Sequence, residues 1–362
     1  MSINYSLISN VHCPKTIWLT RKDGIDFSQM LFSTKINRQY SPALKLSLPR
    51  TTTFATPFRK EFYNPLDKRN IILDGYGFRQ RYEIRFYEAE TQNITIQSIF
   101  NLLEETSWNY VRMFWVCDNE SGHETPGMVK NDLRWVVSRM QLQIDEYPRR
   151  GDELYIDTWV GSSGKNGMRR DWEIRWADNG KVFARATSTW AMVNQKTQRV
   201  WKMPDRVRAE ISRSFIEKRA ILEDSHKKKL VKLDDNDARY VLSGLQPMRK
   251  DQDMNHRVRN ETYVGWMLEA VPDECLENYQ LSNIILEYRR EYKNSDVQVR
   301  SICKPAEVGI IQDGYEENRH VNLNELPKDQ RSIRYTHLLQ VKGKSKCDEI
   351  VRGETTWSKR PV

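Results

Sequence analysis

The segment DQDMNHRVRN combines side chains whose types suit the hydrolysis of an acyl group. Its two carboxylates, its amide and its histidine are Asp251, Asp253, Asn255 and His256. A carboxylate can activate water, an amide can polarise a carbonyl, and the N–H groups at a helix start favour developing negative charge. A further carboxylate, Glu291, follows in the segment EYRREY. We therefore treat these residues as a candidate site for acyl hydrolysis.

The same residues also have a purely structural interpretation. Asp253 and Asn255 belong to the types that make turn and capping hydrogen bonds ahead of a helix. Glu291 lies beside Arg289 and Arg290, where a surface ion pair is common. A motif without structural context does not decide between the two interpretations.

Two helices are predicted where apolar side chains recur at helical spacing, one in each half of the chain. The first carries the stripe Ile96, Ile99, Phe100, Leu103, Ser107, Tyr110, Val111 and Phe114. The second carries Tyr263, Trp266, Met267, Ala270 and Val271, and we expect Asn260 to be its N-cap and Pro272 to end the pattern. The candidate site residues Asp253 and Asn255 thus lie just before the second helix.

An internal repeat links the two halves. The segment RATSTW at 185–190 resembles RGETTW at 352–357, and each follows a β-branched or aromatic run. Ahead of each lie two strand-like runs on either side of a polar turn, at 140–160 and 284–302. A helix followed by antiparallel strands predicts an α+β module in which the sheet wraps around its helix, present twice. The second copy is longer, and we place its insertion near 304–331.

Composition and charge agree with a two-domain globular protein. The 362 residues exceed one ordinary domain of about 100–200 residues, and 38% of them are hydrophobic. Residues 1–60 contain nine basic and two acidic side chains and 14 Ser or Thr, which is typical of an organelle transit peptide or of a disordered tail. The other residues carry 49 basic and 47 acidic side chains, which argues against a nucleic-acid-binding protein.

Cysteine and histidine spacing gives no sign of a metal or cofactor. The five cysteines are scattered without a CxxC pair, and the six histidines lack the paired spacing of ligands on one helix face. No stretch reaches the ~18 apolar residues that a membrane-spanning helix needs. We expect neither a metal nor a cofactor, and no integral membrane segment.

Four stretches together resemble the plant acyl-acyl-carrier-protein thioesterases. They are GSSGKNGMRRDW at 161–172, YVGWMLEA at 263–270, LEYRRE at 286–291 and IVRGETTW at 350–357. The resemblance extends over most of the chain from about Asp74 onward. It implies a tandem hotdog fold, with domains at 74–216 and 238–362 and a link at 217–237 that we expect to be exposed. It also implies an acyl carrier protein as partner, residues 1–60 as a transit peptide, and the plastid stroma as location.

The resemblance also assigns site residues. The D-x-N-x-H motif of the family falls on Asp253 and Asn255, and its glutamate falls on Glu291. Arg257 occupies the histidine position, Tyr292 replaces a cysteine that commonly follows the glutamate, and Arg259 stands where asparagine is usual.

Arg257 changes the chemistry that this site can perform. A guanidinium stays protonated and cannot act as a general base, although it can stabilise an oxyanion. His256 could take over the histidine role only if the loop shifts by one position, because neighbouring side chains in an extended segment point to opposite sides. The expected mechanism has Glu291 positioning or activating water, Asn255 and helix-start N–H groups polarising the thioester carbonyl, and Asp253 orienting Asn255 or a water.

Two functions follow from the resemblance. The first is a hydrolase that releases free fatty acid from acyl-acyl carrier protein. The alternative, raised by Arg257, is a catalytically weakened homologue that binds acyl carriers or acyl chains without efficient turnover. The basic residues Lys165, Arg169 and Arg170 form either a docking cluster for an acidic carrier or a solvated hairpin tip. Acyl-chain preference and oligomeric state stay open.

Overall fold

The structure is a computed structural model, and it describes the ranges 70–115, 124–222, 229–253, 256–292, 298–306, 310–312, 315–317, 332–342 and 347–360. All of them lie within one compact unit, Phe62–Val362. The predicted transit peptide at 1–60 lies outside the described residues.

The helix predicted in the first half is confirmed as α1, Ile96–Phe114. Thr95 caps its start, since the Thr95 hydroxyl oxygen accepts a hydrogen bond from the Ser98 N–H at 3.1 Å. Most of the apolar stripe is buried, with Leu103 and Tyr110 fully withdrawn from solvent. The helix rests on the sheet, and the Trp172 indole N–H donates to the Leu103 carbonyl at 3.2 Å.

The second predicted helix is present as α4, Asn260–Leu268, but it is shorter than its apolar pattern. Its N-cap is Arg259, so the prediction of Asn260 as N-cap is wrong by one residue. The chain leaves the helix after Leu268, and Pro272 is the N-cap of the next short helix, α5, Asp273–Asn278. Proline disfavours helical backbone at the residue before it, which explains why the pattern does not continue as helix.

The main sheet has 12 strands within the described residues. First-half strands are β1 (Ile71–Ile72), β2 (Gly77–Glu83), β5 (Leu133–Ile144), β6 (Glu153–Ser163), β7 (Gly167–Trp176), β8 (Val182–Asn194) and β9 (Arg199–Val200). Second-half strands are β10 (Tyr240–Leu245), β11 (Tyr279–Tyr288), β12 (Val299–Pro305), β15 (Ile333–Lys342) and β16 (Cys347–Lys359).

The strand order shows the duplication directly. Starting from the outer side, the first half runs β2-β6-β7-β8-β5 and the second runs β10-β12-β15-β16-β11. The two halves join edge to edge through β5 and β11, whose pairing runs from Asn283 opposite Gln143 to Glu287 opposite Arg139. The segments RATSTW and RGETTW fall on the corresponding strands β8 and β16. The strands predicted around each polar turn exist, but β5 does not pair with β6, nor β11 with β12; each pairs with other strands.

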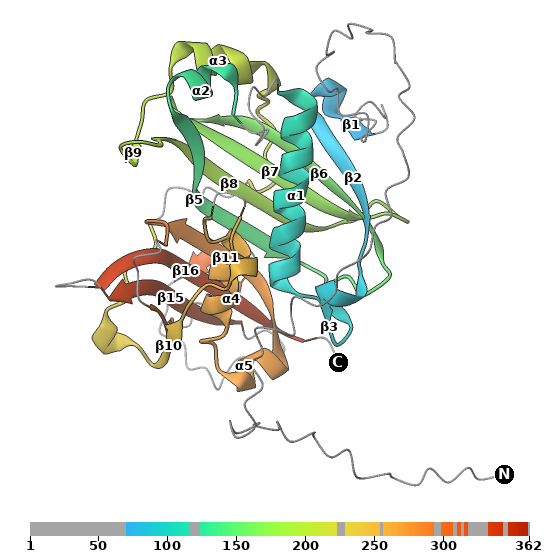
Figure 1. Cartoon of the computed structure of the whole chain (residues 1–362). Helices are drawn as coiled ribbons and strands as arrows, with labels where there is room; N and C mark the ends of the chain where they lie inside the picture. The colour runs from blue at the N-terminus through green and yellow to red at the C-terminus, as the bar shows by residue number, and fades with distance from the viewer. Residues whose placement is uncertain are drawn as a thin grey trace, which may run out of the picture. The chain divides into compact units, whose positions relative to one another are not determined.

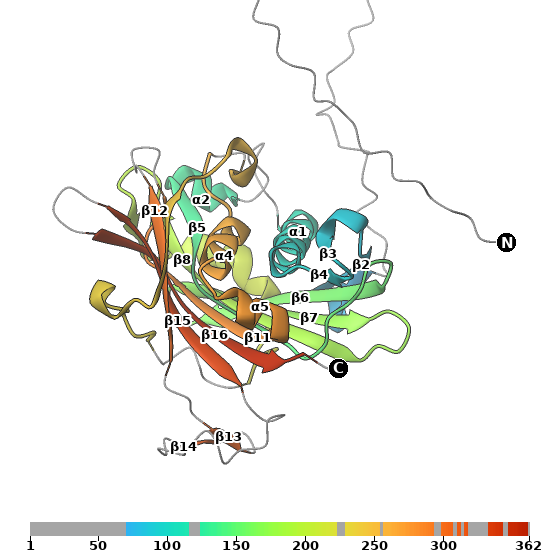
Figure 2. The ribbon, with the colours of Figure 1, turned by 90° about the horizontal axis from the view of Figure 1, so that it is seen from below.

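Helices α1 and α4 cover the same face of the sheet and pack on each other (Figures 1 and 2). Gly265 allows this close approach, because a Cβ built there would lie 3.2 Å from Gln97 Nε2. Side chains of both halves, including Phe100, Leu103, Val264 and Met267, form one continuous apolar core. The two helices are therefore in contact at the seam between the halves.

Hydrogen bonds fix the link between the halves on both sides of its undescribed part. The Ala220 N–H donates to Asp171 Oδ1 at 3.2 Å, and the Leu230 N–H donates to Glu287 Oε1 at 3.1 Å. Ala220, Ile221 and Leu230 are buried, while Lys229 is exposed. The expectation of an exposed connector is thus wrong for these buried residues, and 223–228 lie outside the described residues.

The remaining elements are short. They are η2 (Leu73–Gly75), η3 (Phe86–Glu88), β3 (Ala89–Glu90), β4 (Asn93–Ile94), α2 (Pro126–Lys130), α3 (Asp205–Ile211), η4 (Ser212–Ser214), η6 (Asp235–Asp237), η7 (Arg249–Asp251), β13 (Ile310–Gln312) and β14 (Tyr315–Glu317). Most of the predicted insertion at 304–331 lies outside the described residues, and the bounds of the two domains stay predictions. No helix in the described part of the chain has the length and hydropathy for crossing a membrane.

Candidate active site

The loop before α4 is closed by hydrogen bonds between its two ends. The Asp253 N–H donates to the Arg257 carbonyl at 2.7 Å, and the Arg257 N–H donates to Asp253 Oδ1 at 2.9 Å. An isolated antiparallel bridge between Gln252 and Val258 continues the closure. The loop therefore places Asp253 and Arg257 side by side at the start of α4. Asn255, in the middle of this loop, lies outside the described residues.

Arg257 lies between the two predicted carboxylates. Its Nη2 is 3.1 Å from Asp253 Oδ2, and its Nη1 is 3.8 Å from Glu291 Oε1. The exposed fractions of the Asp253, Arg257 and Glu291 side chains are 25%, 28% and 35%, so a substrate can reach all three. The structure thus brings together three residues that are up to 38 positions apart in the sequence.

Glu291 is positioned by the strand before it and by an arginine of the first half. The N–H groups of Arg289 and Arg290 donate to the Ile350 carbonyl of β16 at 2.8 and 3.3 Å, which fixes the chain beyond β11. Arg134 of β5 then donates from Nη2 to Glu291 Oε2 at 2.9 Å. The carboxylate is therefore held between guanidinium groups of both halves, whereas Arg289 Nη1 lies 3.9 Å from Glu287.

His256 differs from Arg257 in its exposure and in its backbone conformation. It is exposed, and its backbone φ of 57° lies in the left-handed region that non-glycine residues rarely adopt. Its N–H donates to the Asp253 carbonyl at 3.0 Å, which is part of the turn. Arg257, and not its neighbour, therefore supplies the side chain between Asp253 and Glu291.

Tyrosines pack where the segment after β11 meets α4. The Tyr292 N–H donates to the Tyr263 hydroxyl at 3.0 Å. The ring centroids of Tyr263 and Tyr288 are 6.3 Å apart, and those of Trp266 and Tyr292 are 6.4 Å apart. Tyr292, which stands where the resemblance places a cysteine, thus helps to fix Glu291 relative to the helix.

Two further glutamates face the site from α1 and α4. Glu104 is half-buried on α1, and its pKa is raised to about 7 by burial and then by the charge of Glu261, against the opposing effect of Arg259. Glu261, in the first turn of α4, has a pKa raised by burial, and Arg259 Nη1 lies 3.6 Å from its Oε1. The sequence did not single out this pair. A usable signal was present, since Glu104 stands four residues after Phe100 and interrupts the apolar stripe.

The basic residues proposed for carrier docking are mostly interior. Arg169 is buried with its Nε 2.6 Å from Asp171 Oδ2, and Arg170 is buried with its guanidinium 4.7 Å from the centre of the Tyr110 ring. Burial lowers the pKa of Arg170 to about 10. The expectation of a surface cluster is wrong for these two arginines, and Lys165 alone of the three is exposed.

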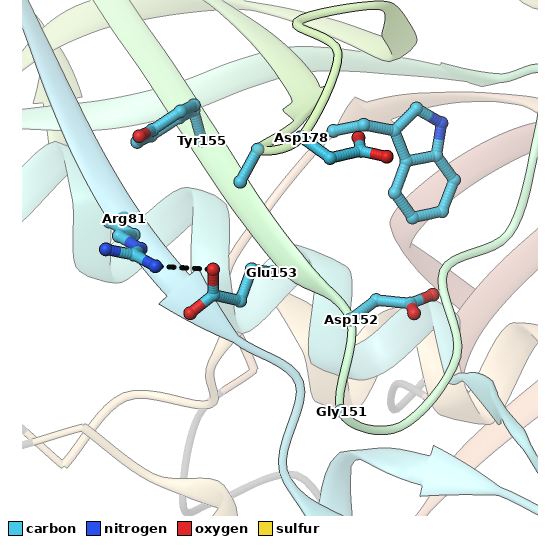
Figure 3. Close-up of a pocket in the computed structure, with 8 residues that line it drawn as sticks. Arg81, Gly151, Asp152, Glu153, Tyr155 and Asp178 are labelled. Carbon is cyan, nitrogen blue, oxygen red and sulfur yellow. Dashed lines mark hydrogen bonds and ion pairs between the residues drawn. The ribbon is translucent and has the colours of Figure 1, made fainter.

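A separate polar pocket lies at the ends of β2, β6 and β7 (Figure 3). It has a volume of about 350 Å³ and is lined in part by Arg81, Asp152, Glu153 and Asp178, with Arg81 and Glu153 paired at 2.5 Å. Its charged lining does not suit an acyl chain, and it contains none of the predicted site residues.

Metal clusters and buried cysteines give no second catalytic arrangement in the described part of the chain. No three His, Cys, Asp or Glu side chains gather there as ligands for a metal ion. Cys275 and Cys303 are buried, and burial raises their pKa values to about 11 and about 12. A thiol must ionise to act as a nucleophile, so these two cysteines are inert.

Two family models match this chain. The acyl-ACP thioesterase N-terminal domain matches residues 75–211, and the acyl-ACP thioesterase C-terminal domain matches 235–359. A chloroplastic palmitoyl-acyl carrier protein thioesterase from Gossypium hirsutum is 41% identical over 81% of this chain and 67% of its own length. The protein of the same name from Arabidopsis thaliana is 38% identical over 82% and 68%. The chain thus spans about two thirds of these relatives.

A solved structure shows the same architecture. The 12:0-ACP thioesterase from Umbellularia californica superimposes with a TM-score of 0.68 and 33% identity, covering 80% of this chain and 96% of that chain. The prediction of tandem hotdog domains in an α+β fold is confirmed by this likeness and by the duplicated strand order. The chain belongs to the acyl-ACP thioesterase family.

Proposed function

We propose that this protein hydrolyses the thioester of acyl-acyl carrier protein and releases free fatty acid in the plastid stroma, with residues 1–60 acting as a transit peptide. Family membership and the chloroplastic relatives support this function. The observation that carries it is the meeting of Asp253, Arg257 and Glu291 at an accessible helix start. Such a place combines a carboxylate for water with positive charge for an oxyanion.

In the proposed mechanism, Glu291 accepts a proton from water as the water oxygen attacks the thioester carbonyl carbon. The resulting oxyanion is stabilised by Arg257, by N–H groups at the start of α4, and by Asn255. The C–S bond then breaks, and the proton passes to the departing carrier thiolate. Asp253 orients Arg257 through the hydrogen bond from Arg257 Nε to Asp253 Oδ2 at 3.2 Å.

One observation favours the alternative function, a weakened homologue that binds without efficient turnover. Both oxygens of Glu291 face guanidinium groups, Oε1 that of Arg257 and Oε2 that of Arg134. These groups compete with water for the carboxylate, and neither can accept a proton. The two functions therefore predict different rates from the same geometry.

A product assay separates the two functions. Purified protein is mixed with acyl carrier protein loaded with chains of defined length, and free fatty acid is measured by mass spectrometry alongside carrier binding. Hydrolase function predicts free acid well above the rate without protein, and loss of that rate in Glu291→Gln. Retained carrier binding with no release in the unmodified protein would support the binding function instead.

A further inference from the structure

Glu104 comes from the first half, yet it faces the site loop of the second half. It stands about two turns after Gln97 on α1, while Glu261 stands about one turn before Gly265 on α4, and Gln97 and Gly265 mark the close contact of the helices. Besides Glu261, the charges that act on Glu104 are those of Arg259, Asp253 and Arg257. The crossing of α1 and α4 thus brings a carboxyl of the first half next to the loop Asp253–Arg257.

Two polar atoms at this crossing are buried without a hydrogen-bond partner. They are Glu261 Oε2 on α4 and the hydroxyl of Tyr288 at the end of β11. A buried acceptor that has no donor destabilises the fold by the full desolvation cost of that group. A carboxyl that keeps its proton provides such a donor, whereas two ionised carboxylates would only repel each other. The unpartnered Glu261 oxygen therefore points to a proton held on the neighbouring Glu104.

The electrostatic surroundings agree with a shared proton. Burial and the Glu261 charge raise the pKa of Glu104 to about 7. Burial and then Tyr263, Glu104 and Glu261 raise the pKa of Tyr288, so this phenol stays protonated as a second donor. The charged groups that face Glu104 are thus Glu261, Arg259, Asp253 and Arg257, with Tyr288 closing the crossing from the sheet.

We propose that Glu104 is a positioning residue of the site: it shares one proton with Glu261 across the α1–α4 crossing, and its charge state acts on Arg257. When Glu104 is neutral, it does not attract Arg257, whose guanidinium then interacts with Asp253, Glu291 and the oxyanion of the reaction. When Glu104 ionises, it attracts the guanidinium and adds negative charge near the place where negative charge develops. This inference rests on the proposed function for its effect on turnover, but not for the shared proton itself.

The sign of the pH effect follows. Protonated Glu104 is the form that favours the oxyanion, so turnover falls as pH rises through about 7. The expected decrease in kcat between pH 6 and pH 8 is about threefold to tenfold, as for one additional charge acting through a partly hydrated site.

The test is the pH profile of the whole chain with Glu104→Gln and a matched control. Glutamine keeps a donor but cannot ionise, so this variant should hold the low-pH rate of the unmodified protein across pH 6 to 8. Glu105→Gln is the control, because Glu105 is the neighbouring exposed residue bonded only at the surface to Gln80 at 3.2 Å. Glu105→Gln should show the same decrease in kcat between pH 6 and pH 8 as the unmodified protein. A Glu104→Gln profile that still decreases between pH 6 and pH 8 would overturn the inference.

A second measurement does not depend on turnover. The protein labelled with carboxyl ¹³C glutamate should show one resonance that titrates near pH 7 and is absent from the spectrum of Glu104→Gln. If the unmodified protein releases no fatty acid, this resonance still tests the shared proton, and the proposed function alone fails. If fatty acid is released but every glutamate resonance titrates below about pH 5, the shared proton is refuted and the proposed function stands.

Discussion

The two halves of the protein share a strand order but differ at the start of their central helices. Thr95 caps α1 with its side chain, and α1 continues for 19 residues. Arg259 caps α4 without a side-chain hydrogen bond, and α4 has only 9 residues. N–H groups at an uncapped helix start stay available to a ligand. Under the proposed mechanism, the first half therefore uses its helix mainly for packing, and the second half uses its helix start to bind the reacting carbonyl.

The first half nevertheless contributes to the site across the seam. Arg134 of β5 holds Glu291, and the charges of Asp253 and Arg257 act on the pKa of Glu104 of α1. The buried pair Arg139 and Glu287, 2.5 Å apart, joins β5 to β11 beside them. Under the proposed mechanism, the duplicated module thus forms one asymmetric site, with Asp253, Arg257 and Glu291 from one copy and charge partners from the other.

The largest expected effect is that of Glu291→Gln. Replacing the carboxylate should lower kcat by about 100-fold or more, because glutamine cannot accept the proton of the attacking water. Glu153→Gln, which alters an exposed first-half ion pair with Arg81, is the control and should stay within about twofold. Rates of fatty acid release at saturating carrier measure both. Equal rates of fatty acid release for the two variants would show that Glu291 is no more important for turnover than an exposed ion pair of the first half.

Arg257→His should raise kcat, by about tenfold, because imidazole can exchange protons near neutral pH whereas guanidinium cannot. The change also removes one of the two guanidinium groups that lie near the Glu291 carboxylate. Steady-state release of fatty acid checks it. An unchanged or lower rate would indicate that the loop depends on the arginine that joins Asp253 and Glu291.

Arg134→Ala tests the contribution of the first half. It removes the 2.9 Å contact that holds Glu291 Oε2 and should lower kcat by about threefold to tenfold, with little effect on stability because the partner is partly exposed. Arg185→Ala, which loses an exposed pair with Asp145 on the same sheet, is the matched control. If kcat is the same in both variants, the site belongs to the second half alone.

The smallest effect concerns the two helix starts. Thr95→Ala should lower the free energy of unfolding by about 1 kcal/mol, because the Ser98 N–H loses its acceptor. Arg259→Ala should cost less, since Arg259 makes no side-chain capping bond. Urea unfolding compares them. A larger loss for Arg259→Ala would show that the start of α4 is held as firmly as that of α1.

Features that depend on local pattern were predictable from the sequence. The apolar stripe of α1 and the strands around 140–160 and 284–302 follow from spacing, and the likeness of RATSTW to RGETTW revealed the duplication. The start of α4 was less predictable: Asn260 is the preferred N-cap type, but the helix already includes it and Arg259 is the N-cap, a difference within the one or two residues by which helix bounds vary.

Features that depend on tertiary pairing were not predictable in the same way. Arg134 meets Glu291 only because β5 and β11 join, at a separation of 157 positions in the sequence. Arg169 and Arg170 looked exposed because their buried surroundings, such as Tyr110, come from another element. Glu104 interrupts an apolar stripe, but what it faces is set by how α1 and α4 cross.

The most direct test of the proposed mechanism is a crystal structure of Glu291→Gln with an intact acyl-carrier thioester. The mechanism predicts the thioester carbonyl at the start of α4, between Arg257 and residue 291, with the carbonyl oxygen toward Arg257. A thioester bound elsewhere, for example at the polar pocket of Asp152 and Asp178, would contradict it.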